Sequence, residues 1–283
     1  MTQPRTVLVT GAAGGVGSAL VRTLTSAGWH VYAAVHRATD VDAFFGQGRV
    51  TPLVLDVTDT ASIAAAAKEV GPRLDGLVNN AGIIVQGPLA LVPEAALRRQ
   101  YDVNVLGPAL LTQALLPALR AARGAVVNVG AVSSLMPVPF AAPIASSKAA
   151  LASLTGAMRG EFGPLGVRVA LVEPGAMRTE IFAKAAANQS ADGYAGGEEM
   201  RRTYAPVWAA VQERLDAQKP APVDATVKAI VAALTARKPR TRRIVGRDAR
   251  VMSQLRRLPD RTRDKVIMRA LGVTANRYGE KSG

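Results

Sequence analysis

The chain of 283 residues contains no cysteine, only two histidines and no run of 18 apolar residues. Without thiols, neither a disulfide framework nor a thiolate metal site can form, and we expect no metal. The amino terminus, MTQPRTVLVTG, enters a strand pattern directly and lacks the apolar core of a signal peptide. We therefore expect a cytoplasmic protein without a membrane span.

Acidic residues are scarce, and the formal net charge is +14. The excess is concentrated in residues 237–283, which hold 15 Lys and Arg and 4 Asp and Glu. A nucleic-acid-binding protein usually carries its basic face on the main domain together with a recognition motif. The body shows neither feature, so we expect no nucleic-acid partner.

Short aliphatic runs alternate with helical patterns along the first 175 residues. Near-continuous aliphatic strands spaced by helices indicate a parallel sheet covered on both faces. The fold class is therefore α/β, a doubly wound Rossmann-like sheet of about seven strands. Strands are expected at 6–10, 31–35, 50–55, 76–79, 125–129, 167–172 and 243–245, and helices at 16–27, 61–70, 94–119 with a break near 107–108, 145–162 and 223–236.

The alternation stops after Pro174. Residues 176–221 contain Gly, Asn and Gln and then an amphipathic stretch at 204–215, which indicates a lid inserted between sheet elements. We expect one domain at 1–248 that includes this lid, and a basic amphipathic extension at 249–283.

The first strand runs directly into the stretch TGAAGGVG and then into a helix. Glycines at positions 11, 15 and 17 let the backbone turn tightly and approach a pyrophosphate, which the helix amino terminus then binds. In this strand–turn–helix context the loop predicts a dinucleotide site. The second strand ends in His36 and Arg37, where an acidic residue would select NAD. A cation there suits a 2′-phosphate, so NADP(H) is the expected cofactor.

Four further motifs accompany the glycine loop: LDVTD at 55–59, NNAG at 79–82, DVNVLG at 102–107 and EPGAMRT at 173–179. Together they resemble the short-chain dehydrogenase/reductase superfamily in its single-domain form, over residues 6–180. The last hundred residues are only loosely similar to members that act on retinoids, steroids or other lipophilic alcohols.

The resemblance implies a role for each matching residue. Asn104 would hold a water in a proton relay, and Lys148 would bind the nicotinamide ribose; these are the retained catalytic positions. Asp56 would hydrogen-bond the adenine. The implied cofactor-binding residues are Gly11, Gly15, Val16, Gly17, Arg37, Asp56, Val57, Asn80, Ala81, Gly82, Lys148, Pro174, Gly175 and Thr179.

The sequence departs from the family at its acid–base pair. The family places a tyrosine four residues before the lysine and a serine 13 residues before the tyrosine, and these positions are Ile144 and Ala131. Neither side chain can donate or accept a proton. A hydroxyl of Ser133 or Ser134, brought inward by a loop shift, could substitute, as could Tyr194 or Tyr204 of the lid. Both histidines, His30 and His36, lie away from the expected reaction centre.

Three functional interpretations follow. The favoured one is a non-redox enzyme that folds a small apolar molecule for cyclisation, isomerisation or elimination, with NADP(H) in the pocket wall. The second is a reductase of an iminium, a conjugated alkene or a carbonyl with a substitute proton donor. The third is a binder without catalysis. The expected apolar pocket is lined by Val85, Ala131, Met136, Phe140, Ile144 and Met177, with Trp208 as a further candidate.

The expected partners are a small hydrophobic molecule and further copies of the chain. The long helices at 94–119 and 145–162 correspond to those through which the family forms dimers or tetramers. The apolar stripe of the 249–283 extension favours packing on the body or on another subunit, with an anionic membrane surface as the less favoured alternative.

Overall fold

The computed structural model describes residues 4–44, 46–177, 181, 195–217, 221–274 and 278. Their strands form one parallel sheet in the order β3-β2-β1-β4-β5-β6-β7. The predicted fold class, a doubly wound α/β sheet of seven strands, is confirmed. The strands are β1 (Thr6–Thr10), β2 (His30–Val35), β3 (Val50–Val54), β4 (Gly76–Asn79), β5 (Ala125–Val129), β6 (Arg168–Pro174) and β7 (Arg242–Val245).

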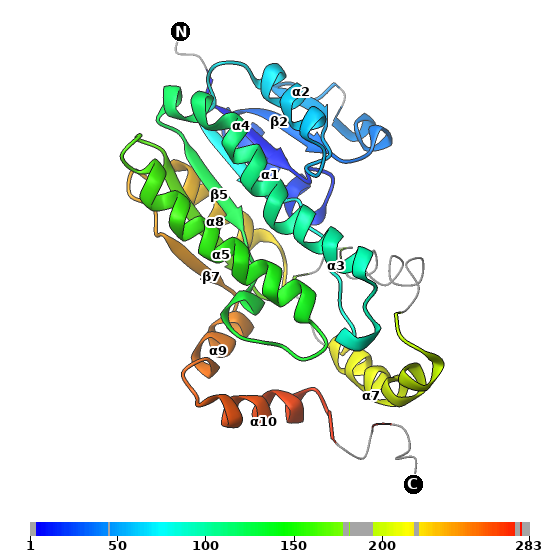
Figure 1. Ribbon diagram of the computed structural model, residues 1–283. Coiled ribbons are helices and arrows are strands. Elements are labelled where there is room, and N and C mark those ends of the chain that lie inside the picture. The colour runs from blue at the N-terminus through cyan, green and yellow to red at the C-terminus, as the bar shows by residue number, and fades with distance from the viewer. Residues whose placement is uncertain are drawn as a thin grey trace.

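Helices cover both faces of this sheet (Figure 1). One face carries α1 and α8, and the other carries α2, α4 and α5. The helices are α1 (Gly15–Ser26), α2 (Thr60–Val70), α3 (Glu94–Tyr101), α4 (Gly107–Ala122), α5 (Ala142–Phe162), α7 (Glu198–Asp216), α8 (Asp224–Thr235), α9 (Arg247–Leu255) and α10 (Asp260–Ala270). Short turns are η1 (Ala38–Asp40), η2 (Asp42–Phe44), η3 (Leu89–Leu91), η4 (Asp102–Leu106) and η5 (Val132–Leu135).

The strand order reverses between β1 and β4, because β1 pairs with β2 on one side and β4 on the other. In doubly wound sheets, ligands bind at the carboxyl ends of the strands beside such a reversal. The loops that follow β1 and β4 therefore define where a functional site is expected.

The predicted helix over 94–119 is interrupted earlier than expected. A π-helical turn, η4, occupies Asp102–Leu106 and separates α3 from α4, whereas the sequence placed the break near 107–108. A π turn inserts one extra residue, which a 3.6-residue apolar pattern does not reveal. The residue after this turn, Gly107, has no room for a side chain, because a Cβ there would lie 2.8 Å from Cγ2 of Val57.

The combined stretch Glu94–Ala122 is long and apolar enough to cross a membrane by length and composition, with a mean hydropathy of 1.3. The sequence analysis expected no such segment. Leu111, Leu115 and Leu119 of this stretch are buried against the sheet, which is the environment of a core helix.

Helix α5 begins at Ala142, three residues before its predicted start. Pro143 is tolerated in the first turn because the amide hydrogens there have no partner within the helix. Ile144 therefore lies in the first turn of α5, one turn before Lys148.

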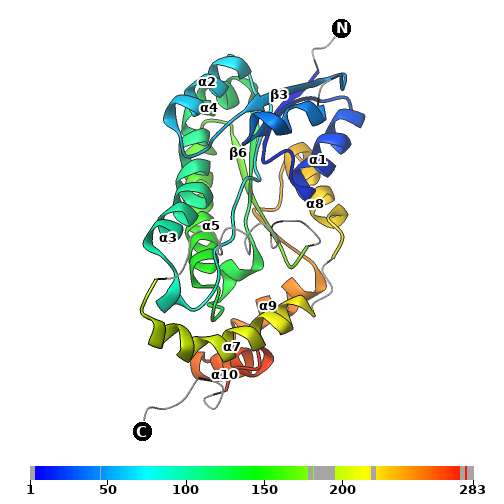
Figure 2. The ribbon, with the colours of Figure 1, turned by 90° about the vertical axis from the view of Figure 1, so that its right-hand side faces the viewer.

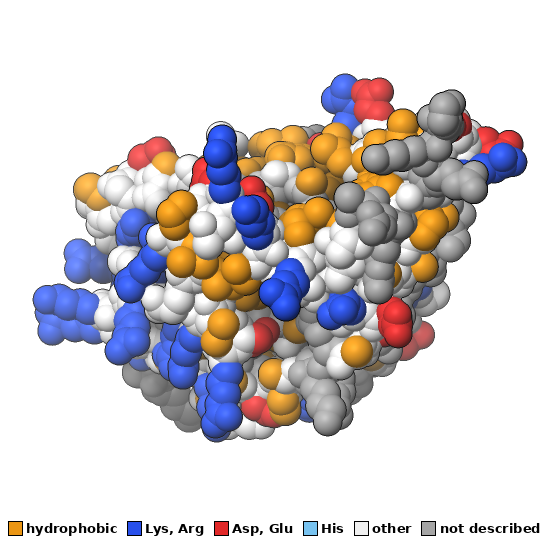
Figure 3. Space-filling model, turned by 90° about the horizontal axis from the view of Figure 1, so that it is seen from below, with side chains coloured by type: hydrophobic (Ala, Val, Ile, Leu, Met, Phe, Trp, Pro, Cys, Tyr) orange, Lys and Arg blue, Asp and Glu red, His pale blue; other side chains and the backbone are white. Residues whose placement is uncertain are grey.

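The extension forms two helices, α9 and α10, separated at Pro259, and they lie beside α7 at one end of the molecule (Figure 2). Met252, Leu255, Ile267 and Leu271 pack with α7 in one apolar cluster. Val251, an apolar residue of the same extension, is 63% exposed, because its side chain points about 100° around the helix axis from that of the neighbouring Met252. Figure 3 views the molecule from this end, where Lys and Arg side chains gather on the left-hand side and apolar side chains lie across the middle and the top.

An ion pair between a buried carboxylate and a partly exposed guanidinium joins β6, β7 and η5. The carboxylate of Glu173 is fully buried and accepts hydrogen bonds from Nη2 of Arg242, at 2.7 Å, from Nε of Arg242 and from Oγ of Ser134. Nη2 of Arg242 also donates to Oγ of Ser134 at 3.1 Å. The pair thereby anchors the edge strand β7 and the turn that follows β5.

Removing Arg242 should destabilise the fold, because it leaves the carboxylate of Glu173 buried without a cation. We expect Arg242→Ala to lower the free energy of unfolding by about 3 kcal/mol. Arg243→Ala, on the neighbouring exposed residue of the same strand, should change it by less than about 0.5 kcal/mol. Urea unfolding followed by circular dichroism measures both, and equal losses would contradict the assigned role of the ion pair.

Candidate active site

The glycine loop after β1 forms the tight turn that the sequence predicts. Gly11 has φ of +63°, and a Cβ on Gly17 would lie 2.1 Å from the Gly11 carbonyl oxygen. Helix α1 starts at Gly15 without a side-chain cap, so its first amide hydrogens have no side-chain acceptor. The loop therefore presents free donors at a helix amino terminus, with Gly15 exposed and Val16 and Gly17 buried beneath it.

The loop is tied to the end of β4 at the strand-order reversal. The Oγ1 atom of Thr10 accepts from the amides of Asn80 and Ala81, at 3.0 and 2.9 Å. The Asn80 amide group donates to the carbonyl oxygens of Thr10 and Gly11, at 2.9 and 3.2 Å. The side chain of Asn80 thus holds the glycine loop in its conformation. The family resemblance also implies that this segment, Asn80–Gly82, binds the cofactor.

The residues expected at the adenosine end lie together. Asp56 follows β3, and its Oδ1 accepts from the amide of Thr58 at 2.8 Å and its hydroxyl at 2.7 Å. Burial acts to raise the pKa of the Asp56 carboxyl, but the bonds from Thr58 and the nearby His36 outweigh it and leave that pKa below its usual value. The carboxyl therefore stays ionised, an acceptor for an amino group. Val57 is buried behind it against Gly107.

Arg37 is exposed and engaged by a neighbour. Its Nε and Nη2 atoms donate to the two carboxylate oxygens of Asp40, both at 3.1 Å. A guanidinium has five N–H donors, so three remain for a phosphate. The cation predicted to meet a 2′-phosphate is thus held in a fixed orientation at the end of β2, with Asp40 as a competing anion.

Lys148 is the buried cation of the site. It is 8% exposed, and its Nζ donates to the Val129 carbonyl oxygen at 2.9 Å. Within the part of the chain that the structure describes, this carbonyl is its sole hydrogen-bond partner. Burial lowers the pKa of the Lys148 ammonium to about 8. Two N–H donors are left over, as a lysine that binds ribose hydroxyls would require.

Asn104 lies beside Lys148 at the bottom of the site. A Cβ on Gly82 would approach Oδ1 of Asn104 to 3.2 Å and Nζ of Lys148 to 3.6 Å, so a side chain there would crowd the Asn104 amide. The Asn104 side chain binds the backbone of Ile83, accepting at 2.9 Å and donating at 3.0 Å. The expected relay water therefore stays a prediction, and the side chain itself is already used to hold the loop after β4.

Gln100 is a site residue that the sequence analysis missed. It is fully buried, accepts from the Val85 amide at 2.6 Å, and donates to the Ile83 carbonyl at 3.0 Å and to Ser147 at 3.2 Å. It lies one helical turn before Asn104, and a polar residue at that spacing on an otherwise buried face is the signal that could have found it. Gln100 connects the loop after β4 to helix α5.

The two family acid–base positions are apolar in the structure as well. Ile144 is 9% exposed and Ala131 is half-buried at the start of η5. Ser134, one of the expected substitutes, does not replace them, because its hydroxyl binds Glu173 and Arg242. Gly130 is explained by the same network, since a Cβ there would lie 3.1 Å from Cγ of Glu173.

The residues expected to line one apolar pocket separate into different groups. Met136 and Phe140 join the cluster of α7 and α10, where the ring of Phe140 stacks on Trp208 with centroids 5.9 Å apart. Met177 packs against the α1 and α8 face instead, with Thr226 donating to its sulfur at 3.2 Å. Val85 is half-buried beside Gln100. Two of the predicted pocket residues, Met136 and Phe140, therefore pack against the lid helix α7.

Three further expectations concern the lid and the loop after β6. Tyr204 packs edge-on against Tyr278, with ring centroids 5.5 Å apart, within the same lid cluster. Thr179 and Tyr194 lie outside the described residues.

Gly175 follows Pro174 and meets Asp248, whose Oδ2 accepts from the Ala176 amide at 2.9 Å. A Cβ on Gly175 would lie 2.0 Å from that oxygen, so α9 holds this loop in place.

Comparisons with known proteins match this geometry to one family. Residues 5–190 match the family model described as short chain dehydrogenase. The NADPH-dependent 3-dehydrocapnine reductase of Ornithobacterium rhinotracheale is 32% identical over 94% of this chain and 97% of its own length. The 3-amino-tetrahydro-pyrrolizinone reductase of Xenorhabdus hominickii is 36% identical over 64% of each chain.

Two solved structures cover almost the whole chain. A short-chain dehydrogenase from Streptomyces avermitilis superposes with a TM-score of 0.76, at 29% identity, over 94% of this chain and 96% of its own. A short-chain dehydrogenase from Burkholderia cenocepacia J2315, in complex with NADP, superposes with a TM-score of 0.75, at 26% identity, over 94% and 98%. The likeness to these structures therefore extends beyond residues 5–190, which the family model matches.

Replacing Lys148 by Met should stabilise the protein without nucleotide at pH 7. The folded-state pKa lies below that of an exposed lysine, so the unfolded chain binds more protons between about pH 8 and 10.5, and stability rises with pH across that window. We expect Lys148→Met to add roughly 2–3 kcal/mol at pH 7 and nothing near pH 10.5. Urea unfolding at several pH values checks this, with the exposed Lys68→Met as control; a pH-independent difference would show that the charge is not penalised.

Proposed function

Because the chain belongs to the short-chain dehydrogenase family, we propose that it is an NADP(H)-dependent reductase of a small, largely apolar molecule. The carrying observation is the retained cofactor side of the site: the glycine loop, Asn80, Asn104 and Lys148 keep the geometry of a nucleotide cradle. The similarity to a reductase named as NADPH-dependent, over nearly the full length of both chains, supports the same proposal.

The residues divide the work of binding among themselves. The amide hydrogens at the start of α1 would bind the pyrophosphate, and the carboxylate of Asp56 would accept from the adenine amino group. Arg37 would meet the 2′-phosphate with the N–H groups that do not bind Asp40. Lys148, held by the Val129 carbonyl oxygen, would donate to the nicotinamide ribose. The bound cofactor would supply a hydride.

The proton that completes the reduction comes from elsewhere than a tyrosine. Hydride addition to a carbonyl leaves an alkoxide, which an apolar pocket with Ala131 and Ile144 stabilises poorly. Hydride addition to an iminium cation gives a neutral amine, so that reduction needs no proton. A conjugated alkene forms an enolate that water can protonate. For a carbonyl substrate, Lys148 is a titratable group of the site whose pKa, about 8, suits proton donation near neutral pH.

This proposal differs from the interpretation favoured by the sequence, in which the cofactor is bound but not consumed. That interpretation rested on the missing tyrosine and serine alone. The reductases among the relatives favour consumption of NADPH, and the retained Lys148 leaves one titratable group for proton transfer. We also propose a cytoplasmic location and a dimer or tetramer formed through the helical segments 94–119 and 145–162.

Cofactor oxidation distinguishes these functions directly. NADPH, and NADH in parallel, is incubated with panels of iminium compounds, conjugated enones and ketones while absorbance at about 340 nm and product formation are followed. We expect steady oxidation of NADPH with an iminium or enone, slower oxidation of NADH, and ketone rates about 10²–10⁴ lower.

Lys148→Met serves as the matched control and should lose turnover through weaker nucleotide binding. Product formed without oxidation of NADPH would contradict the reductase proposal and indicate a non-redox enzyme. Tight NADPH binding with neither product nor oxidation across the panels would leave a binding protein instead.

A further inference from the structure

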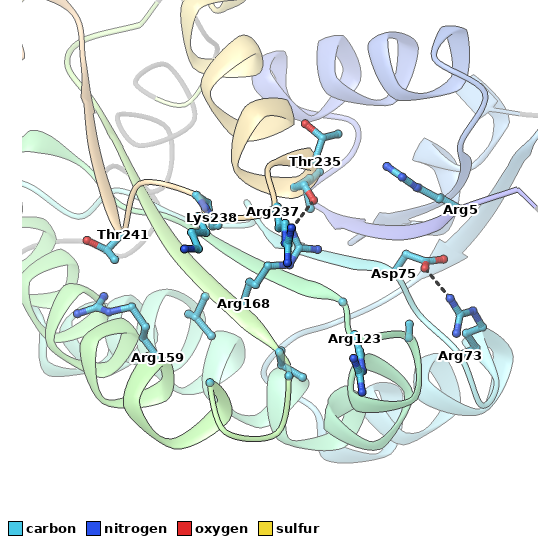
Figure 4. A pocket seen from close by; sticks show the side chains of 18 of the residues that line it. Arg5, Arg73, Asp75, Arg123, Arg159, Arg168, Thr235, Arg237, Lys238 and Thr241 are labelled. Atoms are coloured by element: carbon cyan, nitrogen blue, oxygen red, sulfur yellow. Dashed lines mark hydrogen bonds and ion pairs between the residues drawn. The ribbon is translucent and has the colours of Figure 1, made fainter.

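A large basic cavity lies at the amino ends of the strands, at the opposite edge of the sheet from the glycine loop (Figure 4). Its volume is about 820 Å³. Its walls come from segments that are far apart in the sequence: the start of β1, the segments before β4 and β5, the end of α5, the start of β6 and the loop between α8 and β7. The charged side chains lining it are Arg5, Arg73, Asp75, Arg123, Arg159, Arg168, Arg237 and Lys238.

Seven of these eight side chains are cations, and most of them have no carboxylate partner. Arg73 pairs with Asp75 at 3.0 Å. Among the described residues, no carboxylate lies within 4.0 Å of the charged nitrogens of the other six. Arg5 lies over the ring of Trp29, 5.6 Å from its centroid, and Trp29 is itself buried. The cavity therefore concentrates unneutralised positive charge.

Backbone groups of the fold hold Arg168 in the wall of this cavity. Nη1 of Arg168 donates to the carbonyl oxygens of Leu234 and Ala236, at 3.3 and 2.5 Å. Burial, and then the charge of Arg5, lower the pKa of the Arg168 guanidinium. Like charges at close range in a partly buried site cost free energy, and an anion between them would offset that cost.

The composition of the walls indicates the class of ligand. Guanidinium groups match phosphate oxygens with two parallel hydrogen bonds, and six of the seven cations are arginines. The volume lies in the range of small-molecule pockets, whereas nucleic acids and acidic proteins meet broad basic faces. The one aromatic ring in the walls, Trp29, is 5% exposed and offers no surface on which a base could stack.

We propose that this cavity binds a small anion that carries two or more phosphate groups. The site is separate from the proposed nucleotide site, because the glycine loop lies at the carboxyl ends of β1 and β4 and the cavity lies at their amino ends. Arg237 and Lys238, which by sequence belong to the basic carboxyl-terminal part of the chain, complete it from the loop before β7. The ligand bridges strands β1, β5 and β6 and stabilises the folded chain.

Tripolyphosphate is the probe for this site. We expect isothermal titration calorimetry at about 50 mM salt to show one tripolyphosphate bound per chain, with NADPH either absent or saturating. Arg159→Glu combined with Arg237→Glu should weaken this binding at least tenfold, because both residues are exposed cations of the cavity and, among the described residues, form no ion pair that the substitution would break. The same pair should leave NADPH affinity unchanged.

Arg22→Glu combined with Lys228→Glu is the matched control, since it changes the net charge equally on exposed helix positions outside the cavity. It should alter tripolyphosphate affinity by less than about twofold. Equal weakening by both pairs would overturn the proposal, as would displacement of tripolyphosphate by NADPH, which would place the anion on the glycine loop. Tight binding of a single-stranded oligonucleotide without binding of tripolyphosphate would also overturn it.

Discussion

A buried ammonium group, that of Lys148, organises the candidate site. It is held by the carbonyl at the end of β5, and it reaches the nucleotide side because Gly82 has no side chain. Lys148 lies in the second turn of α5, which begins at Ala142. Asn104 and Gln100 hold the loop after β4 by hydrogen bonds to its backbone. The resemblance to the family implies hydroxyl groups at positions 131 and 144, where this chain has Ala131 and Ile144. On that alignment, the cation is kept while its proton-carrying partner is not.

Much of this site could be predicted from short stretches of sequence. Strand boundaries follow from aliphatic runs, and the glycine loop, Asn80 and Lys148 follow from motifs whose geometry is local. The missing acid–base pair was visible in the same way, as Ile144 four residues before Lys148. The interpretation of that absence was less secure, because a missing side chain does not say which reaction remains. The comparisons shift the balance toward reduction.

The rest depends on contacts between distant segments. Glu173 and Arg242 are 69 residues apart, and Ser134 and Arg242 are 108 residues apart, so no periodicity links them. The π turn at Asp102–Leu106 adds one residue that an apolar pattern does not register. The basic cavity shows the same limit, since counting charges along the chain assigned them to the carboxyl-terminal part. The fold gathers five arginines of the body around Arg237 and Lys238.

The central claim is that the chain can support hydride transfer while positions 131 and 144 carry no hydroxyl that would speed proton delivery to a carbonyl. The most direct test is the rate of NADPH-dependent reduction of a plain ketone by the variant Ala131→Ser with Ile144→Tyr. Restoring the two hydroxyls beside Lys148 should raise that rate by about 10²–10⁴ over the parent. A double variant that binds NADPH as tightly as the parent and reduces the ketone no faster would contradict the account.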